Sequence, residues 1–161
     1  AYRCTIKEDT SGNGVLVLER TSNIDGTLRS MVSFERNGTA VGTILCSNSA
    51  TQYNTSSDHR LKENVVTMSN ATDRLKQLQP KRFNFILNPD ITVDGFLAHE
   101  VQSVVPEAIS GTKDEVDSDN NPVYQGIDQS KLVPLLTAAL QEAVTKIEVL
   151  ETRLNNAGIA T

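Results

Sequence analysis

The pattern of hydrophobic and polar positions divides the chain into a β-like first part and a mixed second part that ends in a helix. Short apolar runs in the first part predict three strands, at residues 15–18, 28–36 and 40–46. Between them stand Asp25-Gly26 and Asn37-Gly38, dipeptides that two-residue hairpins favour because glycine accepts a positive φ. Residues 47–56 are small and polar, which predicts a linker.

The second part of the chain predicts short elements of both kinds. Ser69 is a candidate N-cap for a helix over residues 70–78, which Pro80 ends. Further predicted elements are a strand at residues 82–86, a turn at 88–90, a short buried strand at 96–98 and a helix at 99–105. The acidic stretch 111–122 lacks the glycine and terminal glutamate of an EF-hand loop, so we expect a solvated loop there.

From residue 128 onwards the pattern is helical. Asp128 is a candidate N-cap, and Pro134 lies too deep for an ideal first turn, so we expect a kink or a restart of the helix there. Apolar residues then recur at spacings of 4, 3, 4, 3 and 4, at Leu136, Leu140, Ala143, Ile147, Leu150 and Leu154. This set, called the seam below, has the a/d spacing of a coiled coil, with Lys146 and Glu151 at the flanking g and e positions. The alternative is one amphipathic helix that packs on its own domain.

Composition narrows the function classes. Apolar residues make up 38% of the 161 residues and aromatic residues 4%, a small supply for a monomeric core, so a homo-oligomer is expected to add burial. The net charge is −5 and no basic run is present, which argues against a nucleic-acid partner. The two cysteines form no metal-binding cluster with histidine, so neither a metal nor a cofactor is predicted. No apolar run of transmembrane length is visible, so no membrane partner is predicted.

The junction between the two parts, residues 55–64, holds a candidate nucleophile, Ser57, and a candidate base, Lys62. On a helix, five residues turn by about 500°, which separates the two side chains by about 140°. On a strand, an odd separation places them on opposite faces. A dyad within one chain therefore requires a bend between them, and otherwise the lysine comes from a neighbouring subunit.

Four ordered motifs carry a resemblance. Residues 56–65 read Ser-Ser-Asp-His-Arg-Leu-Lys-Glu-Asn-Val, residues 95–101 read Gly-Phe-Leu-Ala-His-Glu-Val, and residues 128–136 read Asp-Gln-Ser-Lys-Leu-Val-Pro-Leu-Leu. With the terminal heptad helix, they resemble the intramolecular chaperone auto-processing domains, peptidase family S74. These domains lie at the C-termini of phage tailspikes, tail fibres and endosialidases. The resemblance covers roughly residues 41–155.

The resemblance implies an α+β fold in two parts. Residues 1–56 would be the end of a β-rich fibre or spike region with its linker. Residues 57–161 would be a self-cleaving chaperone domain, whose helix at about 128–155 forms a trimeric coiled coil. The partners implied are two further copies of the chain and the upstream fibre region. The protein would assemble in the host cytoplasm and end in the virion tail fibre or spike, with the chaperone fragment released.

For the chemistry, the resemblance implies a single-turnover serine endopeptidase. Ser57 would attack the carbonyl carbon of Ser56, and Lys62 would act as its base. A lysine amine is protonated at neutral pH unless burial or a neighbouring positive charge, such as Arg60, favours its neutral form.

Several residues are candidates for supporting roles. His59 is a rival base, because imidazole titrates near neutrality. Asp58 is expected to cap a turn. Candidate oxyanion donors are backbone N–H groups and the side chains of His59, Asn64 and His99. His99 and Glu100, in the second motif, are expected to pack against or orient the junction.

Two other functions remain open at this point. One is a structural trimerisation module that does not cleave itself. The other is an auto-processed, membrane-tethered transcription factor, which a basic DNA-binding domain upstream would favour. A denaturing gel separates the first from a self-cleaving protein, because only cleavage yields two fragments.

Overall fold

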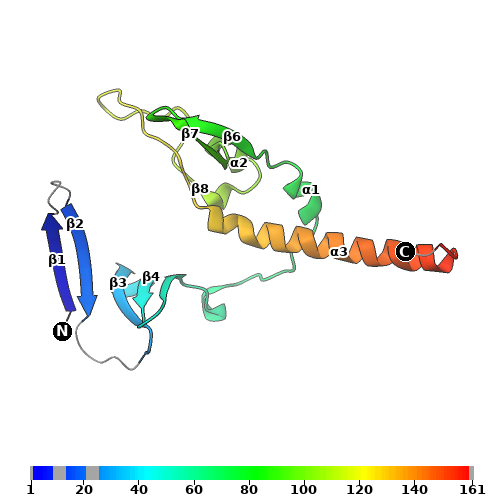
Figure 1. Cartoon of the computed structure of the whole chain (residues 1–161), viewed down its shortest axis with the longest axis horizontal. Helices are drawn as coiled ribbons and strands as arrows, with labels where there is room; N and C mark the ends of the chain where they lie inside the picture. The colour runs from blue at the N-terminus through cyan, green and yellow to red at the C-terminus, as the bar shows by residue number, and fades with distance from the viewer. Residues whose placement is uncertain (1, 9–13, 21–25, 160–161) are drawn as a thin grey trace. The chain divides into compact units, whose positions relative to one another are not determined.

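The computed structural model describes residues 2–8, 14–20 and 26–159 (Figure 1). The chain divides into a first unit, Ala1–Val65, and a second unit, Val66–Thr161. The first unit contains antiparallel strands, and the second combines short strands with helices and ends in a long helix. The prediction of an α+β fold is therefore confirmed.

The described part of the first unit holds a two-stranded and a three-stranded antiparallel sheet. Their strands are β1 (Tyr2–Glu8), β2 (Gly14–Arg20), β3 (Arg29–Arg36), β4 (Thr39–Cys46) and β5 (Thr51–Thr55). The first sheet pairs β1 with β2, and the second has the order β3-β4-β5. The three strands predicted from apolar runs correspond to β2, β3 and β4.

The predicted hairpin at Asn37-Gly38 is confirmed. These residues join β3 to β4 with φ values of 52° and 75°, a turn that needs positive φ at both positions. Asp25, of the other predicted hairpin, lies outside the described residues. Among those described, β2 pairs with β1 and not with β3.

The predicted linker 47–56 is wrong in part, because Thr51–Thr55 forms β5 on the edge of β4. The strand was not predicted because all five of its side chains are exposed, and its sequence therefore lacks the alternation of apolar and polar residues that indicates a strand. Its alternating Thr51, Tyr53 and Thr55 are nevertheless residues that favour extended backbone. Ser47 closes the turn before it, since its Oγ accepts from the backbone N–H of Ala50 at 3.1 Å.

The described residues of the second unit form nine helices and strands. They are α1 (Ala71–Leu75), β6 (Lys81–Phe85), β7 (Asn88–Gly95), α2 (Ala98–Gln102), η2 (Pro106–Ala108), β8 (Ile109–Ser110), β9 (Gly126–Ile127), η3 (Gln129–Leu132) and α3 (Val133–Asn156). Strands β6 and β7 form an antiparallel hairpin, as do β8 and β9.

The predictions of a turn at 88–90 and of a strand at 96–98 are wrong. The turn between β6 and β7 lies at residues 86–87 rather than 88–90, so the apolar Ile86 and Leu87 stand at an exposed turn. Pro89 is tolerated within β7 because this strand lies at a sheet edge. Residues 96–98 form no strand: β7 ends at Gly95, and α2 begins at Ala98.

The small apolar core of the described residues lies in the second unit. Its members come from α1, α2, η2, η3, the start of α3 and the segments that follow α1 and α2, and are Ala71, Leu78, Val101, Val104, Val105, Ala108, Leu132, Leu135 and Ala139. Helices as short as α1 and α2 are not stable alone, so this burial holds them in the unit.

The long helix restarts at Pro134, as the sequence predicts. Asp128 caps η3 by accepting from the backbone N–H of Ser130 at 3.0 Å, and α3 follows with the proline in its first turn. Leu135 and Ala139 face the core of the unit. The seam forms a different stripe that is largely uncovered: Leu140 is 66% exposed and Ile147 54%. Beyond its contacts with α1, the helix extends away from the rest of the unit (Figure 1).

A carboxylate on α3 caps α1. Glu142 accepts from the backbone N–H groups of Ala71 and Thr72 at 2.9 and 2.8 Å and from the Thr72 hydroxyl at 2.6 Å. These bonds lower the pKa of Glu142, the Thr72 hydroxyl first. The prediction that Ser69 caps this helix is wrong, because the N-cap residue is Asn70, with φ of 57° and no side-chain cap bond. The cap thus comes from far along the chain.

Replacing Glu142 by glutamine is expected to lower the thermal midpoint of the full chain at pH 7. The folded-state pKa of Glu142 lies below its usual value of 4.5. The stability that the Glu142 carboxylate adds to the folded chain is therefore fully present above pH 4.5 and is lost as the pH falls through the folded-state pKa. The gap between wild type and variant should therefore shrink in acid. Glu148→Gln, on the same helix and exposed, serves as the control. An equal gap at pH 7 and pH 3 would contradict this assignment.

Candidate functional site

The junction turns back on itself through a single 3-10 turn, η1 (His59–Leu61). Asp58 and Lys62, on either side of it, are extended, with φ and ψ of −62° and 137° and of −126° and 141°. Two backbone bonds close the turn, from Leu61 N–H to the Asp58 carbonyl and from Lys62 N–H to the His59 carbonyl, both at 3.1 Å. This is the bend that a dyad within one chain requires.

The bend brings the two candidate residues into contact. The Nζ of Lys62 donates a hydrogen bond to the Oγ of Ser57 at 2.8 Å, within one and the same chain. This distance lies within the range over which a base can take a proton from a hydroxyl. Both side chains are exposed in the single chain, as are all residues from 51 to 70.

Asp58 caps the turn, as the sequence predicts. Its Oδ1 accepts from the backbone N–H of Arg60 at 2.8 Å. The Arg60 guanidinium also binds the carboxylate with two bonds, from Nε to Oδ1 and from Nη2 to Oδ2, both at 2.9 Å. These contacts lower the pKa of Asp58 and raise that of Arg60. The charge of Arg60 is therefore matched by a carboxylate, which weakens the idea that it favours a neutral Lys62.

His59 stands apart from the pair. Its side chain is 92% exposed, and its Nδ1 lies 3.5 Å from the Asp58 carboxylate. Within the described part of the chain it makes no hydrogen bond to Ser57, whose hydroxyl is bonded by Lys62. Of these two candidate bases, Lys62 is thus the one that contacts the Ser57 hydroxyl in the described residues.

Asn64 and the second motif complete the predicted site residues. Asn64 has a φ of 53°, a conformation that asparagine tolerates better than most residues, and it turns the chain after Lys62. His99 and Glu100 belong to α2 of the second unit. Glu100 pairs with Lys81 at 3.4 Å, and its Oε2 is buried without a hydrogen bond, whereas His99 is exposed beside the acidic loop.

Ser56, whose carbonyl precedes the candidate nucleophile, is held on the sheet. Its backbone N–H donates to the Val41 carbonyl of β4 at 3.2 Å, and its hydroxyl lies 3.4 Å from the carbonyl oxygens of Ala40 and Val41. This anchor was not predicted, because the small, polar residues 47–56 indicated a linker. The alternation of β-branched and aromatic residues in β5 is the signal that indicates it.

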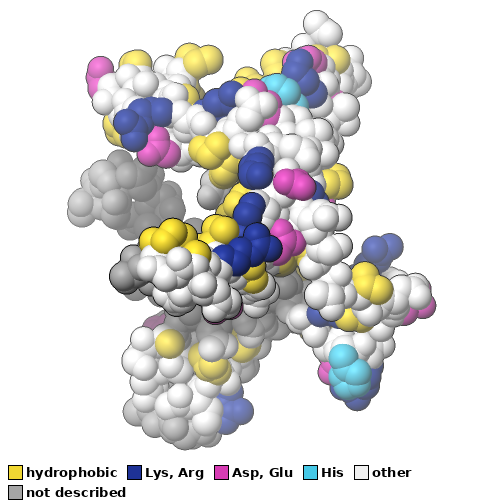
Figure 2. Space-filling view, turned by 90° about the vertical axis from the view of Figure 1, so that its right-hand side faces the viewer, with side chains coloured by type: hydrophobic (Ala, Val, Ile, Leu, Met, Phe, Trp, Pro, Cys, Tyr) yellow, Lys and Arg dark blue, Asp and Glu magenta, His cyan; other side chains and the backbone are white. Residues whose placement is uncertain are grey.

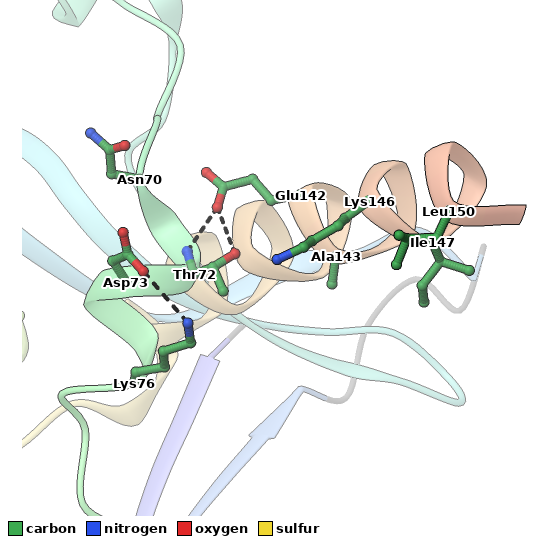
Figure 3. Close-up of a pocket in the computed structure, with 9 residues that line it drawn as sticks. All are labelled: Asn70, Thr72, Asp73, Lys76, Glu142, Ala143, Lys146, Ile147 and Leu150. Carbon is green, nitrogen blue, oxygen red and sulfur yellow. Dashed lines mark hydrogen bonds and ion pairs between the residues drawn. The ribbon is translucent and has the colours of Figure 1, made fainter. Parts of the chain in front are cut away.

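A hollow elsewhere lies between α1 and α3 and is lined partly by seam residues (Figure 3). Ala143, Ile147 and Leu150 form its apolar side, and Lys146 extends along α3 towards Thr72. No group of three or more His, Cys, Asp or Glu side chains in the described residues is placed to hold a metal ion. Among the same residues, no helix is long and apolar enough to cross a membrane.

Residues 57–110 match the family model for peptidase S74, described as the chaperone of endosialidase. The matched segment begins at Ser57 and includes the bend, Lys62 and the motif with His99 and Glu100. No curated protein matches the chain. The resemblance inferred from the four motifs is therefore confirmed over this segment.

Proposed function

We propose that this chain, a member of the peptidase S74 family over residues 57–110, is an intramolecular chaperone that releases itself by autoproteolysis. It assembles three copies of a phage tail fibre or tailspike and helps the upstream β-structure to fold. It then cuts its own backbone between Ser56 and Ser57. The family description supports the chaperone role, and the 2.8 Å contact between Lys62 and Ser57 supports the cleavage.

In the first chemical step, the neutral amine of Lys62 takes the hydroxyl proton of Ser57. The Oγ bonds to the carbonyl carbon of Ser56, the bond from that carbon to the Ser57 nitrogen breaks, and the lysine gives its proton to this nitrogen. The product is an ester between Ser56 and the Ser57 oxygen. Water then hydrolyses the ester, leaving a carboxylate on Ser56 and restoring the hydroxyl. Two easier steps replace the direct attack of water on an amide.

The protonation of the lysine decides when this reaction can begin. In the observed pair the amine donates to the hydroxyl, whereas a base must accept from it. The pair is exposed in the single chain, and water stabilises a charged amine. Covering the junction with neighbouring copies would favour the neutral amine, so cleavage would follow assembly.

The seam supplies a surface for that assembly. Its members project from α3 and contribute little to the core of their own unit. Other hydrophobic side chains are visible at the surface as well (Figure 2), but the seam has the heptad spacing with which a helix can pack against further copies of itself. Holding three chains together raises the effective concentration of upstream segments that must pair over long sequence distances.

A second candidate function is a trimerisation module that does not cleave. The observation in its favour is the exposure of Ser57 and Lys62 to solvent in the single chain. It differs from the first in one measurable respect, the number of fragments on a denaturing gel.

For the cleavage, we expect wild type to give two fragments that separate between Ser56 and Ser57. Ser57→Ala and Lys62→Met should each slow fragment formation by at least about 100-fold, because they remove the nucleophile or the base. Intact mass spectrometry after a timed cell-free synthesis measures both. Lys113→Met, an exposed lysine that pairs with Asp114, is the matched control and should leave the rate unchanged. A wild-type chain of full mass under these conditions supports the second candidate.

For the assembly, we expect Leu140→Lys with Ile147→Lys to shift the native mass of a Ser57→Ala chain from three copies towards one. Both side chains are exposed in the single chain, so the unit should still fold. In the chain with Ser57 intact, the same double change should slow cleavage. Gln141→Lys with Thr145→Lys adds the same charge outside the seam and serves as the control. Full-rate cleavage by a monomer would contradict the dependence on assembly.

A further inference from the structure

We infer that Asp58 and Arg60 form a latch that positions the Lys62 amine on the Ser57 hydroxyl. The inference rests on the proposed function, since it assigns these two residues to the same cleavage. Neither of them bonds to Ser57, so they act through the turn rather than on the reacting atoms. We define the latch as the three hydrogen bonds from Arg60 to the Asp58 carboxylate.

The latch spans the turn that creates the contact. Arg60 donates to the carboxylate through its backbone N–H at 2.8 Å and through two guanidinium N–H groups at 2.9 Å. Extending the main chain between residues 58 and 60 would break the backbone bond, and the two guanidinium bonds hold the carboxylate in place to accept it. Lys62 follows directly after this turn, and its own N–H closes it on the His59 carbonyl.

No apolar packing shares this task. The turn has no buried residue, and its last residue, Leu61, is 71% exposed. Isolated 3-10 turns have poor hydrogen-bond geometry and are not stable alone. An exposed ion pair contributes little in general, but a bidentate pair that also caps a turn fixes both orientation and backbone. The position of Lys62 in the single chain thus depends on polar contacts within residues 58–62.

If Asp58 acted only through its charge, replacing it would change the cleavage rate in the opposite direction. Its carboxylate lies close enough to the Lys62 ammonium for attraction between their charges. Such attraction favours the protonated amine, which is not the base. If charge were the main effect of Asp58, its removal would speed cleavage, whereas loss of the latch slows it. The sign of the change therefore separates the two roles.

The experiment measures first-order cleavage of the full chain during timed cell-free synthesis, with native mass as a check on assembly. Asp58→Ala removes all three bonds and should slow cleavage about tenfold, the effect of losing a turn cap of ordinary strength. Arg60→Ala keeps the backbone bond and should slow cleavage less. The double variant should be no slower than Asp58→Ala, because that change alone already removes the latch. Asp58→Asn should recover part of the rate, since its amide oxygen still accepts from the backbone N–H of Arg60.

A matched control comes from a second bidentate pair in the chain. Arg82 binds Asp94 on the β6–β7 hairpin at 2.8 and 3.0 Å, also at the surface. Asp94→Ala should leave the cleavage rate unchanged. An unchanged or faster rate for Asp58→Ala, or a double variant whose slowing is the product of the two single effects, would overturn the latch.

A second readout does not need cleavage. In the Ser57→Ala chain, Asp58→Ala should raise the hydrogen-exchange rates of the Leu61 and Lys62 amides about tenfold after correction for sequence, because both amides close the turn. Unchanged exchange overturns the latch even if wild type never cleaves. Conversely, if Asp58→Ala speeds exchange but wild type never cleaves, the latch is supported and the proteolytic function is rejected.

Discussion

A single turn of backbone between residues 58 and 62 brings the Lys62 amine to the Ser57 hydroxyl, and the proposed chemistry of the junction depends on this contact. Without it, the amine and the hydroxyl would point apart on any regular helix or strand, since five residues match neither period. The turn is short, exposed and closed by two backbone bonds and one carboxylate. A contact of this kind is local in sequence, yet whether it is reactive depends on what surrounds it. The family match, the turn and the seam are consistent with one proposal, in which neighbouring copies cover the contact between Lys62 and Ser57 only after assembly.

The second unit shows how such a chain holds its parts in place with few apolar residues. Its core is small and built from short helices, and one charged side chain on α3 closes the end of α1. Packing on one stripe of α3 leaves the adjacent stripe free. The two stripes differ by one residue in register, about 100° around the helix axis. One helix thereby belongs both to its own unit and to the proposed assembly.

Much of this could be predicted from the sequence. Apolar runs located β2, β3 and β4, Asn37-Gly38 located a hairpin, and Pro134 located the restart of the long helix. These are local signals, in which the residue type itself dictates the backbone. The ordered motifs around Ser57 and Lys62 carried the resemblance to the family whose model matches residues 57–110. The need for a bend between the two residues followed from helical and strand periods alone.

Other features were out of reach because they depend on contacts between distant residues. The cap of α1 by Glu142 joins positions about 70 residues apart, so the nearby Ser69 was the reasonable but wrong choice. Strand β5 escaped prediction because none of its side chains is buried and its pairing with β4 decides its structure. The partnership of Arg60 with Asp58 was missed for another reason: the charge of the arginine was considered, but not the geometry of its fork.

Strand β5 has one further consequence, which follows from its place at the end of its sheet. The main-chain groups on its outer side have no strand partner among the described residues, so they can template a strand from another polypeptide. An open edge of this kind promotes aggregation of a monomeric protein, whereas a fibre-forming protein can use it for pairing between chains. The polar Gln52 and Asn54 add no apolar surface to this strand, while its open backbone can still pair with an added strand.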